Sequence, residues 1–239
     1  LYSHQMQKLY LIPSALGNVP IDHILPGNVH SVINAVDFYI VENERTARRF
    51  LLKAGLKKHV NDITFFVLNK YTSTVDTEKY LQTISQSDFG IISEAGVPCI
   101  ADPGAEIVKM AHEKGIRVVP LVGPSSVLMT MMASGLNGQN FAFVGYLPVK
   151  NSERINRIRQ LEKRSHLENQ SQIFIETPYR NNQLLKSILE VCHPGTKLCI
   201  GVDISLDSEI IETRSIVEWR AKRPDLHKRP AVFIIQRFP

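Results

Sequence analysis

The sequence predicts an α/β protein of two domains, the first built on a mostly parallel sheet and the second on a mixed sheet. Over the first half, short apolar runs alternate with amphipathic segments, which is the pattern of strand–helix–strand units. Glycine and proline then cluster at Pro120, Gly123 and Pro124, as at a domain boundary. The last two apolar runs, 209–214 and 231–236, favour antiparallel pairing. We therefore expect domains at 6–119 and 120–239 of the 239 residues.

In the first domain, residues 1–5 are expected to form an unstructured lead-in. Strands are predicted at 9–12, 37–41, 63–68, 89–92 and 116–122, and helices at 29–36, 44–54, 76–86 and 103–114. Gly55 is placed to end the second of these helices. Asp102 is placed to cap the last one, with Pro103 as its first residue.

The second domain is expected to begin with an apolar helix at 125–133, capped by Ser125. Further strands are predicted at 141–144, 173–176, 197–202, 209–214 and 231–236, and further helices at 153–164 and 182–191. Met129, Met131 and Met132 form a stripe on the first helix. We interpret the stripe as core packing rather than as a cofactor site.

Composition excludes several classes of protein. With 44% hydrophobic and 21% charged residues, the chain is neither disordered nor of low complexity. No apolar run approaches the roughly 20 residues of a membrane helix, and no secretory signal is recognised. Three cysteines and eight scattered histidines favour reduced thiols in the cytoplasm and no metal site. The net charge of +5 fits either a solvated basic surface or attraction to RNA.

The common catalytic motifs are missing: the sequence has no P-loop, no G-x-G-x-x-G, no G-x-S-x-G and no H-E-x-x-H. Instead, loops rich in glycine, proline and small residues follow two predicted strands, at 93–104 and at 123–126. Ligands of open α/β sheets bind outside the carboxyl ends of the strands. The two loops therefore indicate either a ligand pocket or a pair of tight strand–helix turns.

Residues 92–104, ISEAGVPCIADPG, resemble the SDAGTPxISDPG signature of the tetrapyrrole-methylase superfamily. Further resemblances follow the order of that family's branch that methylates a ribose 2′-hydroxyl of small-subunit ribosomal RNA. They are LYLIPSALGN at 9–18, VENER at 41–45, VVPLVGPSS at 118–126, ASGL at 133–136, GYLPVK at 145–150 with Arg154 beyond it, and IETPYR at 175–180.

The resemblance implies a methyltransferase of tetrapyrrole-methylase fold, a homodimer with S-adenosylmethionine bound in a cleft between its two domains. Carried over by position, the cofactor contacts would be Ser93, Glu94, Ala95, Gly96, Ile100, Ser125, Ser126, Thr177, Val202 and Asp203. Transfer of a methyl group needs positioning more than acid–base groups, which agrees with the absence of a catalytic triad.

Two carboxyl groups and three basic residues are candidates for the reaction itself. Glu42 or Glu176 would orient or deprotonate the acceptor hydroxyl, although Glu176 could instead form an ion pair with Arg180. Lys150, Arg154 and Arg180 would bind RNA phosphates. The alternative for Lys150 and Arg154 is a solvated helix face.

The chain also departs from the ribosomal branch, which carries an RELTK-type segment where this sequence has GVDISLD at 201–207. The departure keeps two other interpretations open. One is a methyltransferase whose acceptor is a tetrapyrrole ring carbon. The other is a module that binds cofactor or RNA without turnover.

Overall fold

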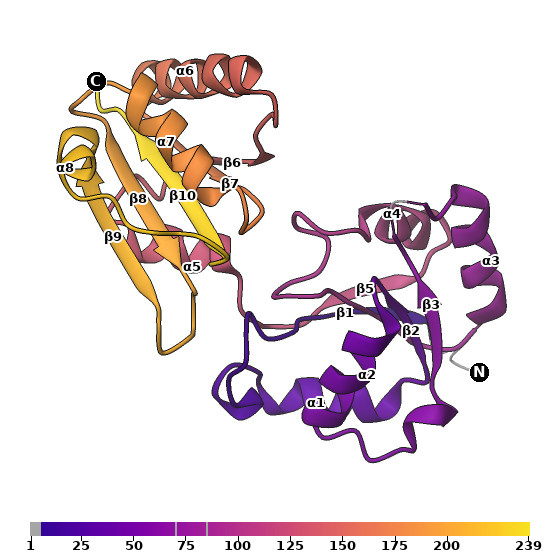
Figure 1. Cartoon of the computed structure of the whole chain (residues 1–239). Helices are drawn as coiled ribbons and strands as arrows, with labels where there is room; N and C mark the ends of the chain where they lie inside the picture. Colours follow the sequence, from indigo (N-terminus) through magenta and orange to yellow (C-terminus); the bar gives the residue numbers. More distant parts are fainter. Residues whose placement is uncertain (1–5, 70, 85) are drawn as a thin grey trace. The chain divides into compact units, whose positions relative to one another are not determined.

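The computed structural model describes residues 6–239 except residues 70 and 85. The lead-in expected at 1–5, and residue 85 of the helix expected at 76–86, lie outside the described residues. The chain divides into two compact units, one ending at Pro124 and the other beginning at Ser125 (Figure 1). Residues 120–124 therefore group with the first unit. They are held to its first strand, because the Leu121 N–H donates to the Leu11 carbonyl over 3.0 Å.

The first unit contains a five-stranded sheet of order β3-β2-β4-β1-β5. All its pairings are parallel, so the predicted α/β class is confirmed for this unit. The strands are β1 (Lys8–Ile12), β2 (Phe38–Val41), β3 (Thr64–Val67), β4 (Phe89–Ile92) and β5 (Arg117–Pro120). The helices are α1 (Gly27–Ala35), α2 (Glu44–Lys53), α3 (Thr74–Ile84) and α4 (Ala105–Glu113), with short 3-10 turns at Ile21–His23 and Val60–Asp62.

Helices cover both faces of this sheet (Figure 1). Alternate residues of a strand point to opposite faces, and neighbours on β2 show the consequence. Tyr39 joins the buried cluster of α1 and α2, whereas Ile40 joins the cluster of α3 and α4. An all-parallel sheet needs this double cover, because its connecting helices lie on its faces.

Local signals fix the ends of α2. The Asn43 side chain accepts hydrogen bonds from the N–H groups of Arg45 and Thr46 at the start. At the other end Gly55 adopts a φ of 80°, as predicted for the glycine that follows the helix.

The predicted start of α4 is wrong. The helix begins at Ala105 with Gly104 as its N-cap, and Asp102 and Pro103 belong to the preceding loop. The φ of 131° at Gly104 is a conformation that suits glycine alone, and this turn delays the helix.

The second unit has a mixed five-stranded sheet of order β6-β7-β10-β8-β9. Only β6 and β7 pair in parallel, so the expected mixed sheet is confirmed. The strands are β6 (Phe141–Tyr146), β7 (Ser171–Ile175), β8 (Lys197–Val202), β9 (Ile210–Ser215) and β10 (Ala231–Gln236). The helices are α5 (Ser126–Ala133), α6 (Asn151–Glu168), α7 (Asn181–Val191) and α8 (Ile216–Ala221). The last of these was not expected; a Ser215–Glu218 capping box starts it.

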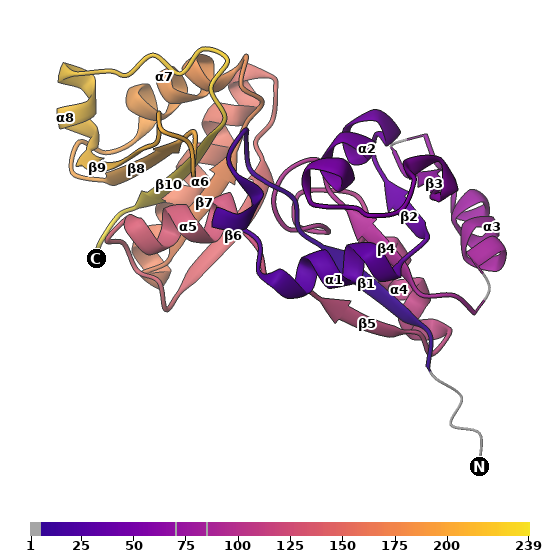
Figure 2. The same cartoon turned by 90° about the horizontal axis from the view of Figure 1, so that it is seen from below.

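Helix α5 packs on one face of the second sheet and α6 and α7 on the other (Figure 2). Ser125 caps α5 as predicted, its side chain accepting from the Leu128 N–H. The methionine stripe divides, because Met131 is buried while Met132 is 83% exposed. Core packing therefore accounts for Met131, and the interpretation is wrong for Met132.

Candidate functional site

Strands β1 and β4 are neighbours in the first sheet, and the connections that leave them run in opposite directions. The chain passes from β1 through α1 to β2 and from β4 through α4 to β5, on opposite sides of the β4–β1 pair. Such a reversal of strand order is where open α/β sheets form a crevice for ligands. A pocket of about 450 Å³ lies there, within the first unit.

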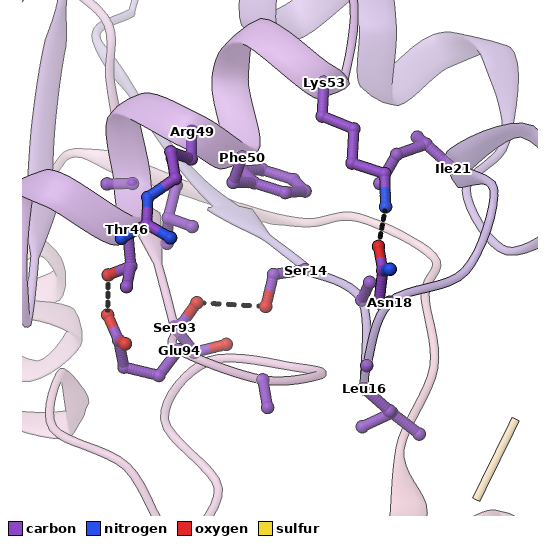
Figure 3. A pocket seen from close by; sticks show the side chains of 15 residues that line it. Ser14, Leu16, Asn18, Ile21, Thr46, Arg49, Phe50, Lys53, Ser93 and Glu94 are labelled. Carbon is purple, nitrogen blue, oxygen red and sulfur yellow. Dashed lines mark hydrogen bonds between the residues drawn. The ribbon is translucent and has the colours of Figure 1, made fainter. Parts of the chain in front are cut away.

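Loops that follow β1 and β4 form one side of this pocket, and α2 forms the other (Figure 3). The two loops are tied together: the Ser14 hydroxyl donates to the Ser93 carbonyl over 3.0 Å, and the Ser93 hydroxyl donates to the Gly96 carbonyl over 2.7 Å. The pocket walls are thus positioned by the central strands of the sheet.

Three of the residues predicted to contact cofactor, Ser93, Glu94 and Ala95, line this pocket. Gly96 lies behind them, and a Cβ there would come within 2.9 Å of both the Leu16 side chain and the Pro124 carbonyl oxygen. Glycine is therefore required for the close approach of the two loops. Ile100, later in the same loop, is 51% exposed.

Carboxyl groups gather at the same edge of the sheet. Glu42 follows β2, and burial together with the charges of Asp102 and Glu94 raises its pKa, against the effect of a backbone hydrogen bond from Glu94. Burial and then the charge of Glu94 raise the pKa of Asp102 to about 6. Among the described residues, the buried Glu42 Oε1 has no hydrogen-bond partner. These carboxyls therefore retain protons more strongly than ordinary acids do.

The remaining predicted cofactor residues belong to the second unit. Thr177 follows β7, and Val202 and Asp203 lie at the end of β8. Both strands run antiparallel to β10, which lies between them, so their carboxyl ends share one edge of the sheet. Ser125 and Ser126 lie at the start of α5.

Asp203 is already engaged in contacts within the second unit. Its Oδ2 accepts from the Arg229 guanidinium over 2.8 Å and from the Ser208 hydroxyl over 2.9 Å. The carboxylate therefore fixes the loop that follows β8.

The alternative considered for Glu176, an ion pair with Arg180, is what the structure shows. The Glu176 side chain is 2% exposed and lies 2.6 Å from the Arg180 guanidinium. Burial alone would raise its pKa, but hydrogen bonds from Arg180 and from the Thr177 N–H lower it overall. Glu176 is therefore a paired carboxylate.

The placement of Arg154 overturns both interpretations offered for it. The residue is 1% exposed, and its guanidinium donates to Ser187, the Val149 carbonyl and Asn151. It lies on the inward face of α6 together with Ile158. An arginine held in this way is neither a phosphate contact nor part of a solvated face. Lys150, in contrast, has a 73% exposed side chain, 3.2 Å from Glu153.

Sequence reasoning missed the wall that α2 contributes to the pocket, formed by Thr46, Ala47, Arg49, Phe50 and Lys53. Thr46, Phe50 and Lys53 follow one another at helical spacing, so the sequence did contain the signal for a shared face. Which way that face points depends on the strand order, which the sequence did not provide.

Two other kinds of feature are absent from the described residues. Within these residues no group of three or more His, Cys, Asp or Glu side chains is arranged to hold a metal ion. No helix among them has the length and apolar character to cross a membrane.

Comparison with known proteins begins with sequence. No protein-family model matches the chain. A curated relative from Vibrio cholerae named ribosomal RNA small subunit methyltransferase I is 27% identical over 96% of this chain and 77% of its own length. A relative of the same name from Bacillus subtilis is 30% identical over 77% of this chain and 59% of its own length.

Solved structures extend the comparison to the fold. The crystal structure of the methyltransferase CobJ has a TM-score of 0.62 and 14% identity, covering 97% of this chain and 94% of that one. A cobalt precorrin-4 methyltransferase, CbiF, has a TM-score of 0.63 and 11% identity over 99% and 97% of the two chains. Both show that the fold is shared. The chain is therefore similar in sequence to proteins named ribosomal RNA small subunit methyltransferase I, and it shares its fold with these two methyltransferases.

Proposed function

We propose that this protein is an S-adenosylmethionine-dependent methyltransferase that modifies a ribose 2′-hydroxyl of small-subunit ribosomal RNA. The observation that carries the proposal is the similarity to the Vibrio cholerae ribosomal RNA methyltransferase over 96% of the chain. The pocket at the carboxyl ends of β1 and β4 supports it, because this edge is where an α/β sheet binds ligands.

The residues around the pocket fit S-adenosylmethionine, which would supply a methyl group on a positively charged sulfur. Backbone groups of Ser93 to Gly96 offer hydrogen-bond partners for its polar groups, and the Glu94 carboxylate matches its positive charge. Ile100 of the first unit is a further proposed contact with the cofactor. The second unit is proposed to contribute Ser125, Ser126, Thr177, Val202 and Asp203.

The reaction forms a carbon–oxygen bond at the ribose and breaks a carbon–sulfur bond, leaving S-adenosylhomocysteine. The hydroxyl proton must leave at the same time. Glu42 is the better of the two candidate acceptors, because its raised pKa lies closer to the working range of a general base. Glu176 is occupied by Arg180, so we assign it the positioning of the loop that carries Thr177.

RNA contacts outside the pocket are assigned to Lys150 and Arg180, which remain at the surface, and no longer to Arg154.

We also propose a cytoplasmic homodimer, on the basis of the resemblance to the family. Light scattering on the purified protein measures the dimer directly, and a monomeric mass at working concentration would overturn that part.

The test of the function is titration with S-adenosylmethionine followed by transfer of a labelled methyl group to small ribosomal subunits. The diagnostic variant is Ala95→Trp, because Ala95 is exposed and lines the pocket. The matched control is Ala35→Trp at the exposed end of α1. We expect micromolar cofactor binding, lost in the first variant and kept in the second.

Each result of this test is decisive. Methyl label in ribosomal RNA that resists alkaline cleavage at one position supports the proposed acceptor. Cofactor binding with label in a precorrin instead of RNA would reassign the acceptor to a tetrapyrrole. Binding with no transfer to either would indicate a module without turnover, and no binding would remove the methyltransferase proposal.

A further inference from the structure

Three strands of the second unit bring exposed aromatic and basic side chains to one edge of its sheet. Strands β6 and β7 run parallel, and Tyr146 lies opposite Ile175 at their carboxyl ends. Strand β10 runs antiparallel to β7, so its first residues lie at the same edge (Figure 1). The loop at 176–180, which follows β7, therefore meets the loop at 222–230, which precedes β10.

Hydrogen bonds hold these two loops together. The Lys228 N–H donates to the Pro178 carbonyl over 3.2 Å, and the Asn181 side chain donates to the Arg229 carbonyl over 2.6 Å. Asn181 is buried, so the second of these bonds is shielded from water. The loops therefore form a single surface, and the side chains exposed on it are held in a fixed arrangement.

Tyr179 lies on this surface and is 72% exposed. Its ring makes a T-shaped contact with His227 of the other loop, with the ring centroids 6.2 Å apart. Tyr146, which is 56% exposed, places a second aromatic side chain at the same edge. Core packing does not account for rings that are exposed to this extent. Aromatic rings held at a surface are the groups on which proteins stack the bases of single-stranded nucleic acids.

Two cations accompany the rings. Lys228 is exposed and forms no ion pair with any described residue. Arg180 is bonded to Glu176 through one guanidinium nitrogen, and among the described residues its Nε has no hydrogen-bond partner. The hydrogen bond with Glu176 raises the pKa of Arg180, and Tyr146 adds to this effect. A ring and a guanidinium are thus close together at this edge, and the charge of Lys228 is left for an anion.

We propose that this edge of the second sheet binds single-stranded RNA, with a base stacked on Tyr179 and phosphates on Arg180 and Lys228. Stacking accounts for the exposed ring and phosphate binding for the unpaired charge, so one class of ligand explains both. The inference rests on the proposed function and extends it to the nucleotides around the acceptor. The same loop carries Thr177, a proposed cofactor contact, which would bring the RNA next to the reaction.

The test of stacking uses the full chain and two RNA oligonucleotides of equal length, one with bases and one abasic. The abasic strand keeps the phosphates and cannot stack. Tyr179→Leu should weaken binding of the strand with bases about fivefold or more and leave binding of the abasic strand unchanged. Tyr179→Phe keeps the ring and should bind as the wild type does. The matched control is Tyr71→Leu, at an 81% exposed tyrosine of the first unit, and it should have no effect.

Lys228→Gln separates charge from stacking, because glutamine removes the charge and leaves the loop to the same backbone conformation. It should weaken binding of both strands by the same factor. It should also reduce the slope of log affinity against log salt by about 0.7, the value for one phosphate of a single strand. Lys114→Gln, at an exposed lysine that follows α4, is the control and should match the wild type.

Failure of the RNA surface and failure of the function are distinguishable. Unchanged RNA affinity in Tyr179→Leu, with methyl transfer to small ribosomal subunits intact, would overturn the surface alone. An equal loss for both strands in this variant would also overturn it, because the ring would then shape the loop instead of stacking. Loss of S-adenosylmethionine binding with RNA binding unchanged would assign the ring to the cofactor and overturn it too. The expected RNA results in a protein that transfers no methyl group would retain the surface and overturn the function.

Discussion

The two units both have five-stranded sheets. They differ in how the charged side chains at the carboxyl ends of their strands are paired. In the first unit Glu42 and Asp102 have raised pKa values, and among the described residues Lys53 donates to the neutral Asn18 side chain and forms no ion pair. In the second unit Glu176 has a lowered pKa and Asp203 is paired with Arg229. Paired charges stabilise a fold, whereas unpaired ones cost stability and are retained where a ligand needs them.

The largest effect is expected in the second unit, where a buried charged side chain holds neighbouring elements together. Replacing Arg154 by alanine leaves the Val149 carbonyl and two side chains without their donor, inside a packed helix interface. We expect the free energy of unfolding to fall by about 3–5 kcal/mol, measured by urea denaturation. Lys150→Ala, at the exposed start of α6, should change it by less than about 0.5 kcal/mol. Equal effects of the two changes would contradict the burial-based assignment.

A smaller effect is expected at Glu176. Its lowered pKa means that the pair with Arg180 stabilises the folded state above the ordinary carboxyl pKa and loses this contribution as pH falls through the folded value. Glu176→Gln should therefore cost about 1 kcal/mol at neutral pH and progressively less as the pH falls through the folded-state pKa. Thermal unfolding across this range measures the difference, and a cost that grew on acidification would refute the pairing.

An effect of similar size has the opposite sign and belongs to the first unit. Because the pKa of Asp102 is raised to about 6, the folded state binds its proton more strongly, and stability falls as pH rises through that value. Asp102→Asn removes this cost. It should stabilise the protein by about 1 kcal/mol at about pH 8 and by almost nothing at about pH 4. Stabilisation that is independent of pH would show that the carboxyl charge is not its cause.

Most of the fold could be predicted from the sequence, because the spacing of apolar residues and the positions of helix-ending and turn residues are local properties. The strands at 89–92, 197–202 and 231–236 have the predicted bounds. Helix α8 was missed because six residues are too few to show a helical period. The start of α4 was misplaced because the unusual φ of Gly104 leaves no mark in the amino-acid pattern.

For the candidate site too, local features could be predicted from the sequence and features that depend on strand order could not. Composition predicted a loop after the strand at 89–92 but left open whether it forms a pocket, and the α2 wall could not be predicted, because strand order decides what faces that loop. Arg154 shows an avoidable error. It precedes Ile158 by four residues and Leu161 by seven, so helical period put it on the buried face. Its charge was given more weight than its position.

Helix α2 both packs on the sheet and lines the pocket, and different residues do each. Ala47 and Leu51 hold it to the sheet, while Arg49 and Lys53 face the pocket from the same ten residues. Substitutions at the second pair need not disturb the first, since no described core residue forms a hydrogen bond or an ion pair with either cation. The lining of the pocket can therefore change by substitution at exposed positions of α2 while the helix stays packed on the sheet.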